Sequence, residues 1–341
     1  MSKILVTGGA GFIGSYVTDI LVKKGHHVFS VDNLSGGFIE NVNPKSEFAK
    51  LDLTNSKKTD DYIRKIKPEI IYHLAADATE GRSQFTPLKA TSNNYLAYLN
   101  TLVPAIKNGL EKIVLVSSMS VYGKQKPPFS EKTPTKPVDI YGIAKEAMEK
   151  ATDILSSVYG FKYIIIRPHN VYGPKQNMTD PYRNVISIFI NCLMMNKNFY
   201  IYGDGNQERA FTYIDDCAPY IVKAGLSDID KEIFNIGPIE KVNINQISKL
   251  ILSQFVEDPQ NAPPHLQPIY LKDRPNEVKF AYCTNEKAKK YLGFRQQTPL
   301  KKGIVETVNY AKLKGPKKFK YLTSLEITTK DTPLTWTDKL I

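Results

Sequence analysis

Short apolar runs alternate with amphipathic stretches through the first 170 residues of the chain. The apolar runs are rich in β-branched residues and bounded by turn residues, which predicts buried strands at residues 3–7, 27–31, 70–74, 113–117 and 163–167. Amphipathic stretches between them, such as 14–24 and 141–159, predict helices. Strand, helix and strand at this spacing pair in parallel through right-handed crossovers, so we expect a doubly wound parallel α/β sheet of the Rossmann type.

The pattern becomes irregular after Pro168, where prolines and glycines interrupt short runs. Turn-rich sequence of this kind suits a smaller, irregular lobe that carries ligand loops. We therefore expect a Rossmann domain over residues 1–170, with a segment at about 212–238 returning to it. A ligand-binding lobe is expected over 171–311, followed by a basic C-terminal tail over 312–341.

The chain is basic, with a net charge of +12 from 46 Lys and Arg against 34 Asp and Glu. Part of the excess lies near the end of the sequence, at Lys312, Lys314, Lys317, Lys318 and Lys320. No aromatic RNA-binding signature accompanies these lysines, so we expect a solvated tail and no nucleic-acid partner.

The sequence patterns typical of a signal peptide, of a membrane span and of a metal site are all weak. The chain opens as a strand that runs into a glycine turn, without the basic and apolar regions of a signal peptide. The longest apolar stretch, around 185–195, is broken by Ser187 and Asn191 and is too short for a bilayer. Three cysteines form no CxxC pair, which argues against disulfides and zinc. We expect a cytoplasmic protein without a membrane partner or a metal.

A glycine-rich loop follows the first predicted strand. The segment TGGAGFIG sets Gly8, Gly11 and Gly14 at GxxGxxG spacing, a variant of the dinucleotide-binding fingerprint. Glycine allows close backbone approach to a pyrophosphate, and the following helix offers free N–H groups to the phosphates. Asp32 ends the second strand, where a carboxylate accepts hydrogen bonds from ribose hydroxyls and repels a 2′-phosphate. The pattern therefore favours NAD over NADP.

A candidate catalytic set follows the fourth predicted strand. Tyr141 and Lys145 stand at i and i+4 of the segment YGIAK, on one face of a predicted helix. A neighbouring ammonium favours the phenolate and lowers the pKa of the tyrosine towards neutrality. Upstream, Ser117, Ser118 and Ser120 follow a buried strand, so their hydroxyls should emerge at the carboxyl edge of the sheet, where ligands bind.

At this point the sequence resembles the extended short-chain dehydrogenase/reductases, and within them the nucleotide-sugar epimerases and dehydratases. The resemblance runs from Lys3 to about Gly303. Its ordered motifs are TGGAGFIG, VDNLSGG, HLAA, SSMSVYG, YGIAK, RPHNVYGP, IYGDGNQERAF and RPNEV.

The resemblance implies roles for individual residues. Tyr141 would be the catalytic base, Lys145 would bind the nicotinamide ribose and tune the tyrosine, and Ser118 would be the hydroxyl partner. The residues that match NAD contacts are Gly8, Gly11, Phe12, Ile13, Asp32, Asn33, Ser35, Gly36, Asp52, Leu53, Leu74, Ala75, Ala76, Asn94, Tyr141, Lys145 and Pro168.

The same resemblance implies a binding site for a nucleotide sugar, expected to be UDP-linked. Its diphosphate would be held by Asn170, Arg209 and Arg274, because forked guanidinium donors suit phosphate oxygens. The full set of expected substrate contacts is Ser118, Ser120, Asn170, Asn184, Val185, Tyr200, Tyr202, Arg209, Arg274 and Glu277. Among these, Glu277 matches a carboxylate that contacts the nucleoside ribose.

The residue types at positions 119 and 120, Met and Ser, narrow the choice among the reactions of the resembling enzymes. The resembling 4,6-dehydratases carry Asp-Glu there, and decarboxylases and a 3,5-epimerase carry other acid–base groups at the second position. Without them, we expect oxidation of the C4 hydroxyl and return of the hydride to the opposite face, which is 4-epimerisation. Ala281 matches a position where a large residue blocks N-acetyl sugars, so N-acetylhexosamines are expected to fit.

Several alternatives remain open from the sequence. Arg82 lies where a cation could pair with an acidic sugar such as UDP-glucuronate, or it is an exposed loop arginine. His169 replaces an aromatic residue of the family at the expected edge of the nicotinamide and sugar site. A reductase or dehydratase is a further alternative, and a non-catalytic NAD-sensing or RNA-binding protein is a remote one. The broad apolar surface of helix 141–159 favours a homodimer.

Overall fold

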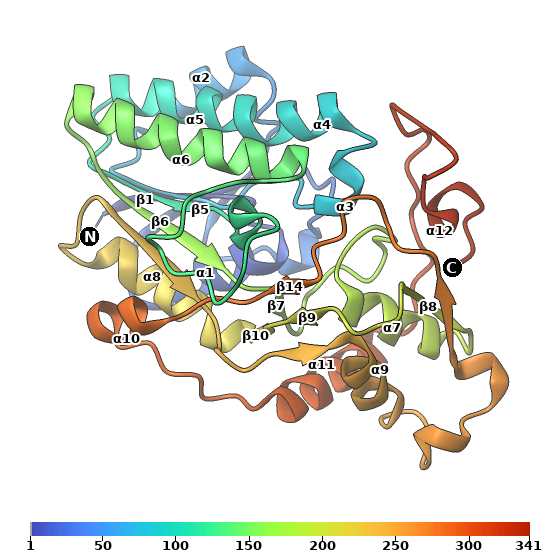
Figure 1. Ribbon diagram of the computed structural model, residues 1–341. Helices are drawn as coiled ribbons and strands as arrows, with labels where there is room; N and C mark the ends of the chain where they lie inside the picture. Colours follow the sequence, from blue (N-terminus) through green and yellow to red (C-terminus); the bar gives the residue numbers. More distant parts are fainter. Residues whose placement is uncertain (1) are drawn as a thin grey trace.

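A parallel sheet forms the centre of the computed structural model, which describes residues 2–341 (Figure 1). Within that range the sheet has seven strands, and every neighbouring pair is parallel. In spatial order the strands are β11 (Glu232–Ile236), β6 (Lys162–Pro168), β5 (Lys112–Val116), β4 (Ile70–His73), β1 (Lys3–Thr7), β2 (His27–Asp32) and β3 (Glu47–Lys50). The strand order reverses beside β1, so the carboxyl edge there opens into a crevice.

Helices cover both faces of this sheet. One face carries α2 (Ser56–Ile66), α5 (Ala97–Lys107) and α6 (Ile140–Tyr159), and the other carries α1 (Phe12–Lys23) and α8 (Ala218–Leu226) (Figure 1). Successive strand residues alternate between the two layers: Ile4 and Val6 join one core cluster, and Leu5 joins the other. Near-continuous apolar strands are therefore explained by burial on both faces.

The expected doubly wound parallel fold is confirmed. The five strands that the apolar runs predict are present, each within one residue of its expected start. Strand β3 was not predicted because its four residues, EFAK, lie at the sheet edge and none is buried. Strand β11 pairs with β6, so the chain returns to the central sheet after passing through the lobe.

The second lobe consists of small sheets and short helices. Strand β8 (Phe199–Tyr202) pairs with β13 (Pro268–Leu271), and β7 (Val171–Tyr172) pairs with β10 (Thr212–Tyr213). The remaining elements of the lobe are β9 (Glu208–Arg209), β12 (Val242–Asn243), β14 (Phe280–Ala281), α7 (Val185–Met194), α9 (Ile244–Leu252) and α11 (Leu300–Lys314). Helix α10 (Glu286–Leu292) instead packs against β11 and α8.

Short helical segments shape the loops at the carboxyl edge of the sheet. They are α3 (Glu80–Ser83), α4 (Pro87–Thr91), the π-helical η2 (Ser92–Leu96) and the 3₁₀ turns η1 (Ile39–Asn41), η3 (Met119–Tyr122) and η4 (Ile214–Asp216). Two further 3₁₀ turns, η5 (Pro259–Asn261) and η6 (Pro264–Leu266), lie in the lobe before β13. None of the helices described in residues 2–341 combines the length and apolarity needed to cross a membrane.

The C-terminal tail packs onto the molecule, while its five lysines are exposed, as expected. After α11 the chain forms α12 (Leu334–Thr337), in which Thr335 and Trp336 are buried. Trp336 joins Phe85 and Tyr182 in a separate apolar cluster. This docking was not predicted, because it rests on long-range apolar contacts and not on any local periodicity.

Candidate active site

A cavity of about 640 Å³ lies at the carboxyl edge of the sheet and extends into the lobe. The ends of β1, β2, β4, β5 and β6 contribute residues to its wall, together with loops of the lobe and the end of the chain. Every residue expected to bind substrate lines it, and so does every residue expected to bind NAD except Asn94. The structure therefore brings together positions that are far apart in the sequence.

The glycine loop forms a close-fitting cradle at one end of the cavity. Gly8 has a φ of +69°, and a Cβ there would lie 2.9 Å from the backbone nitrogen of Ala75. A Cβ on Gly14 would lie 2.1 Å from the carbonyl oxygen of Gly8. Helix α1 starts after Gly11 without a side-chain cap, so its first N–H groups remain available to a phosphate.

Asp32 links this cradle to the second strand. Its carboxylate accepts hydrogen bonds from the backbone N–H groups of Leu34 at 2.7 Å and Ala10 at 3.2 Å, while the residue still lines the cavity. Burial raises the pKa of Asp32, and these backbone hydrogen bonds oppose the shift. A carboxylate beside a row of free N–H groups fits the ribose and pyrophosphate of NAD, so the residues present suit this cofactor.

Asn94 does not belong to this wall. It is fully buried in η2, where its Oδ1 accepts from the backbone N–H of Asp77 at 3.1 Å and its Nδ2 donates to the carbonyl of Ala90 at 2.7 Å. The neighbouring Asn93 lines the cavity instead. Backbone groups use both ends of its amide, so Asn94 holds the loop after β4 from behind the cavity wall.

Tyr141, Lys145 and Ser118 meet in the middle of the cavity. Asp139 caps α6 by accepting from the N–H of Gly142 at 2.7 Å, which places Tyr141 in the first turn. Tyr141 and Lys145 are both buried, and the Lys145 ammonium lies 5.7 Å from the centroid of the tyrosine ring. Ser118 precedes η3, and its hydroxyl lies close enough to the phenol to lower the pKa of Tyr141.

The electrostatics of this set are dominated by burial. Burial raises the pKa of the Tyr141 phenol above its ordinary value, and the carboxylate of Glu80 adds to that shift. Burial lowers the pKa of Lys145 to about 8, against the opposing effect of Glu149 and Glu80. Forming the phenolate therefore needs positive charge nearby, which the Lys145 ammonium and a bound nicotinamide ring would both supply.

A buried carboxylate joins the catalytic helix to the sheet. Glu149 lies one turn beyond Lys145 on α6 and accepts from the hydroxyl of Ser117 at 2.5 Å. Arg167, at the end of β6, binds the same carboxylate through Nε at 2.9 Å and Nη2 at 2.5 Å. Ser117 and Ser118 follow one another at the end of β5. The ion pair between Glu149 and Arg167 therefore fixes the end of β5, which carries the Ser118 hydroxyl, against α6, which carries the Tyr141 hydroxyl.

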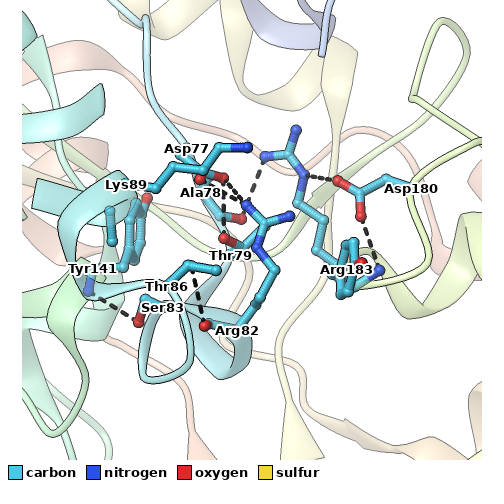
Figure 2. Close-up of polar contacts among 12 residues, drawn as sticks. Asp77, Ala78, Thr79, Arg82, Ser83, Thr86, Lys89, Tyr141, Asp180 and Arg183 are labelled. Carbon is cyan, nitrogen blue, oxygen red and sulfur yellow. Dashed lines mark hydrogen bonds and ion pairs between the residues drawn. The ribbon is translucent and has the colours of Figure 1, made fainter. Parts of the chain in front are cut away.

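Arg82 is not the exposed loop arginine that was one alternative: it is buried, lines the cavity and is paired with Asp77. Only 5% of its side chain is accessible, and its Nη2 lies 2.6 Å from each carboxylate oxygen of Asp77 (Figure 2). Its guanidinium lies 4.7 Å from the centroid of the Tyr182 ring. Figure 2 also shows Arg183 paired with Asp180 beside it. The predicted loop cation is therefore neutralised within the protein.

Glu277 lies between the two arginines expected to hold a diphosphate. Its Oε1 is 3.0 Å from Nη2 of Arg209, and its Oε2 is 2.8 Å from Nη2 of Arg274. Both guanidinium groups line the cavity. The carboxylate thus orders this pair of phosphate-binding side chains, a role that the spacing RPNEV did not reveal.

His169 is fully buried and does not line the cavity, contrary to its expected place at the edge of the site. Neither ring nitrogen has a hydrogen-bond partner within residues 2–341, and burial lowers its pKa to about 4. The side chain lies against Gly237, where a Cβ would be 2.5 Å from its Nδ1. Close packing between the end of β6 and the end of β11 explains why it points inward.

Sequence reasoning missed Glu80. It begins α3 in the loop after β4 and lines the cavity, and in residues 2–341 its carboxylate has no ion pair or side-chain hydrogen bond. The signal was available: a carboxylate soon after a strand end lies at the ligand-binding edge of such a sheet.

Comparisons with known proteins agree with this geometry. The sequence model of the NAD dependent epimerase/dehydratase family matches residues 4–237. The chain belongs to this family. The expected resemblance is thereby confirmed, and the chain is an NAD-dependent enzyme of the epimerase/dehydratase class.

Two relatives with solved structures and one curated sequence illustrate the similarity. A putative UDP-glucose 4-epimerase of Methanocaldococcus jannaschii is 36% identical over 91% of this chain and 98% of its own. UDP-glucose 4-epimerase of Thermotoga maritima, solved with UDP-glucose, has a TM-score of 0.82 at 33% identity, covering 90% of this chain and 98% of its own. UDP-glucuronic acid 4-epimerase of Bacillus cereus, solved with UDP-glucuronic acid and NAD, has a TM-score of 0.81 at 28% identity, covering 91% and 99%.

Replacing the buried phenol tests the catalytic set. We expect Tyr141→Phe to lower kcat by about 100-fold or more, because the base is lost while the ring and the NAD cradle remain. Turnover of nucleotide sugars and the amount of bound NAD would be measured together. Tyr159→Phe, at the exposed end of the same helix, is the matched control and should behave as the wild type. Unchanged kcat in Tyr141→Phe would exclude the phenol as the base.

Proposed function

We propose that the chain is a UDP-sugar 4-epimerase that interconverts UDP-glucose and UDP-galactose, and their N-acetyl forms. The observation that carries the proposal is the meeting of Tyr141, Lys145 and Ser118 in one cavity with a dinucleotide cradle. Met119 and Ser120 line the same wall and offer no carboxylate for loss of water. Ala281 also lines the cavity, and its small side chain leaves space for a 2-acetamido group.

The residues present support both halves of such a reaction. Tyr141 would take the proton of the C4 hydroxyl with Ser118 sharing it, and Lys145 would stabilise the phenolate. Bound NAD supplies the hydride acceptor and donor for C4. Between oxidation and reduction the sugar must turn over, while Arg209 and Arg274 hold the diphosphate. Tyr141 then returns its proton to the new hydroxyl.

The charge of the cavity favours a neutral sugar over UDP-glucuronate. Arg82 is neutralised by Asp77, so it does not offer a free cation to a uronate. The Glu80 carboxyl lines the cavity, and no ion pair within residues 2–341 neutralises it. A uronate carboxylate placed near Glu80 would add like-charge repulsion.

Product analysis tests the proposed reaction. Purified protein would be incubated with UDP-glucose, UDP-galactose, their N-acetyl forms and UDP-glucuronate, and the products followed by NMR. We expect C4 epimers of the neutral sugars at equilibrium, without net consumption of NAD. A stable 4-keto sugar, a pentose product or stoichiometric oxidation of the substrate would identify a dehydratase, decarboxylase or dehydrogenase instead.

Glu80→Gln tests the charge argument. The ratio of kcat/KM for UDP-glucuronate to that for UDP-glucose should rise by about tenfold or more, because the amide removes the repulsion. Glu40→Gln makes the same change of charge at an exposed position outside the cavity and should leave the ratio unchanged. If Glu80→Gln instead abolished turnover of every sugar, Glu80 would be an acid–base group and not an electrostatic filter.

A homodimer through α5 and α6 is also proposed. These helices lie side by side on the outer layer of the sheet (Figure 1). Ile143, Ile154 and Val158 on α6 and Val103 on α5 are between 41% and 67% exposed. Pairing the same surface in a second copy would bury these side chains in a four-helix contact.

Light scattering coupled to gel filtration tests this assembly. We expect the wild type to elute as a dimer and Ile154→Asp to shift it towards the monomer, since a charge would be buried in the apolar contact. Leu313→Asp is the control, because Leu313 is 87% exposed on α11, away from this surface. A monomeric wild type at micromolar concentration would reject the dimer.

A further inference from the structure

The last part of the chain forms a strap over the cavity, which we define as residues 316–341. It leaves α11 and contacts the lobe, where the N–H of Lys320 donates to the carbonyl of Thr179 at 2.7 Å. Further along, the N–H of Glu326 donates to the carbonyl of Phe85 at 2.9 Å, on the Rossmann side. The strap therefore bridges the two sides of the cavity, and Figure 1 shows it beside α3 and β8.

A carboxylate anchors the strap to the Rossmann side. The two oxygens of Glu326 accept hydrogen bonds from the N–H groups of Leu88 at 2.8 Å and Lys89 at 2.9 Å. These N–H groups lie in the first turn of α4, where the helix itself provides no acceptor for them. A negative charge at a helix start satisfies orphan donors and interacts favourably with the backbone dipoles.

Trp336 is the main side chain that the strap places in the cavity wall. It is 5% exposed and packs edge-on against Phe85, with ring centroids 5.8 Å apart, and against Tyr182 at 5.4 Å. A Cβ on Gly81 would lie 3.6 Å from its ring and 3.3 Å from Nη1 of Arg274. The indole therefore lies where the sugar-side helix α3 meets the arginine expected at the diphosphate.

Thr335 carries the strap to the nucleotide end. Its hydroxyl is hydrogen-bonded to the hydroxyl of Tyr202, and it lines the cavity. The Tyr202 ring lies 5.1 Å from the guanidinium of Arg274, so the two expected nucleotide contacts and the strap form one group. A ligand held by Arg274 and Tyr202 would lie within reach of both Thr335 and Trp336.

We propose that the strap completes the nucleotide-sugar site, with Trp336 and Thr335 acting as substrate-positioning and specificity residues. This proposal rests on the proposed nucleotide-sugar function and adds a wall that the ordered motifs do not contain.

The intrinsic fluorescence of the protein tests the contact directly, because Trp336 is the single tryptophan of the chain. UDP would be titrated into the full-length, NAD-loaded protein while binding is measured in parallel by calorimetry. We expect a saturable change in Trp336 emission with the same Kd as the calorimetric titration. UDP that binds by calorimetry without any change in emission would overturn the contact.

Kinetics separate a substrate role from a structural one. Trp336→Ala should raise KM for the nucleotide sugar by about tenfold or more, as loss of a buried aromatic anchor does, with kcat and bound NAD little changed. Trp336→Phe should recover much of the affinity. Leu334→Ala is the matched control, because Leu334 lies on the same short helix and is 52% exposed. Thr335→Val should weaken UDP binding by a smaller factor.

These outcomes are distinguishable from failure of the proposed reaction. Equal KM values in Trp336→Ala and wild type would overturn the strap proposal even if NMR shows C4 epimers. A higher KM in Trp336→Ala, together with a change in Trp336 emission that has the calorimetric Kd, would support the strap proposal even if the product were a keto sugar. Absence of UDP binding to the wild type would reject the strap as a nucleotide-binding wall.

Discussion

A buried ion pair holds the catalytic helix to the sheet. Glu149 on α6 binds Arg167 at the end of β6 and the hydroxyl of Ser117 at the end of β5, all in the protein interior. Removing one partner of such a pair would leave an uncompensated buried charge, which typically costs about 3–5 kcal/mol. The same carboxylate opposes the effect of burial on Lys145, so one group sets both the geometry and the charge of the site.

Elsewhere in the cavity wall, carboxylates are paired with arginines and neutralise them. Asp77 neutralises Arg82, Asp180 pairs with Arg183, and Glu277 is shared by Arg209 and Arg274. Two guanidinium groups around one carboxylate keep a net positive charge for a diphosphate, while Glu80 adds a carboxylate without an ion pair in residues 2–341. The charge of the site therefore changes along the cavity in the sense that a nucleotide sugar requires, with its anionic end and its neutral end apart.

Local spacing explains why the fold and the catalytic set were predictable from the sequence. GxxGxxG and YxxxK act through neighbours on one turn or one helix face, so Gly8, Gly14, Tyr141 and Lys145 needed no knowledge of distant residues. The pairing of Arg82 with Asp77 and the inward orientation of His169 depend on packing between elements, and no local pattern encodes it. The position of Asn94 behind the cavity wall was not predictable for the same reason, since its neighbour Asn93 in the π-helical turn lines the cavity instead.

The proposed 4-epimerisation would place opposite demands on the two ends of the substrate. The diphosphate and nucleoside must stay anchored through the whole cycle, whereas the hexose must present both faces of C4 to one nicotinamide. Large groups lie at the first end, where the guanidinium of Arg274 lies 5.1 Å from the centroid of the Tyr202 ring and Trp336 packs against Phe85 and Tyr182. The sugar end is lined by small side chains, including Ala78, Gly81, Ser118, Ser120 and Ala281. In the proposed reaction, an anchored nucleotide beside a pocket of small side chains would let the ketone turn over without leaving the site, and the proposed strap would strengthen that anchor.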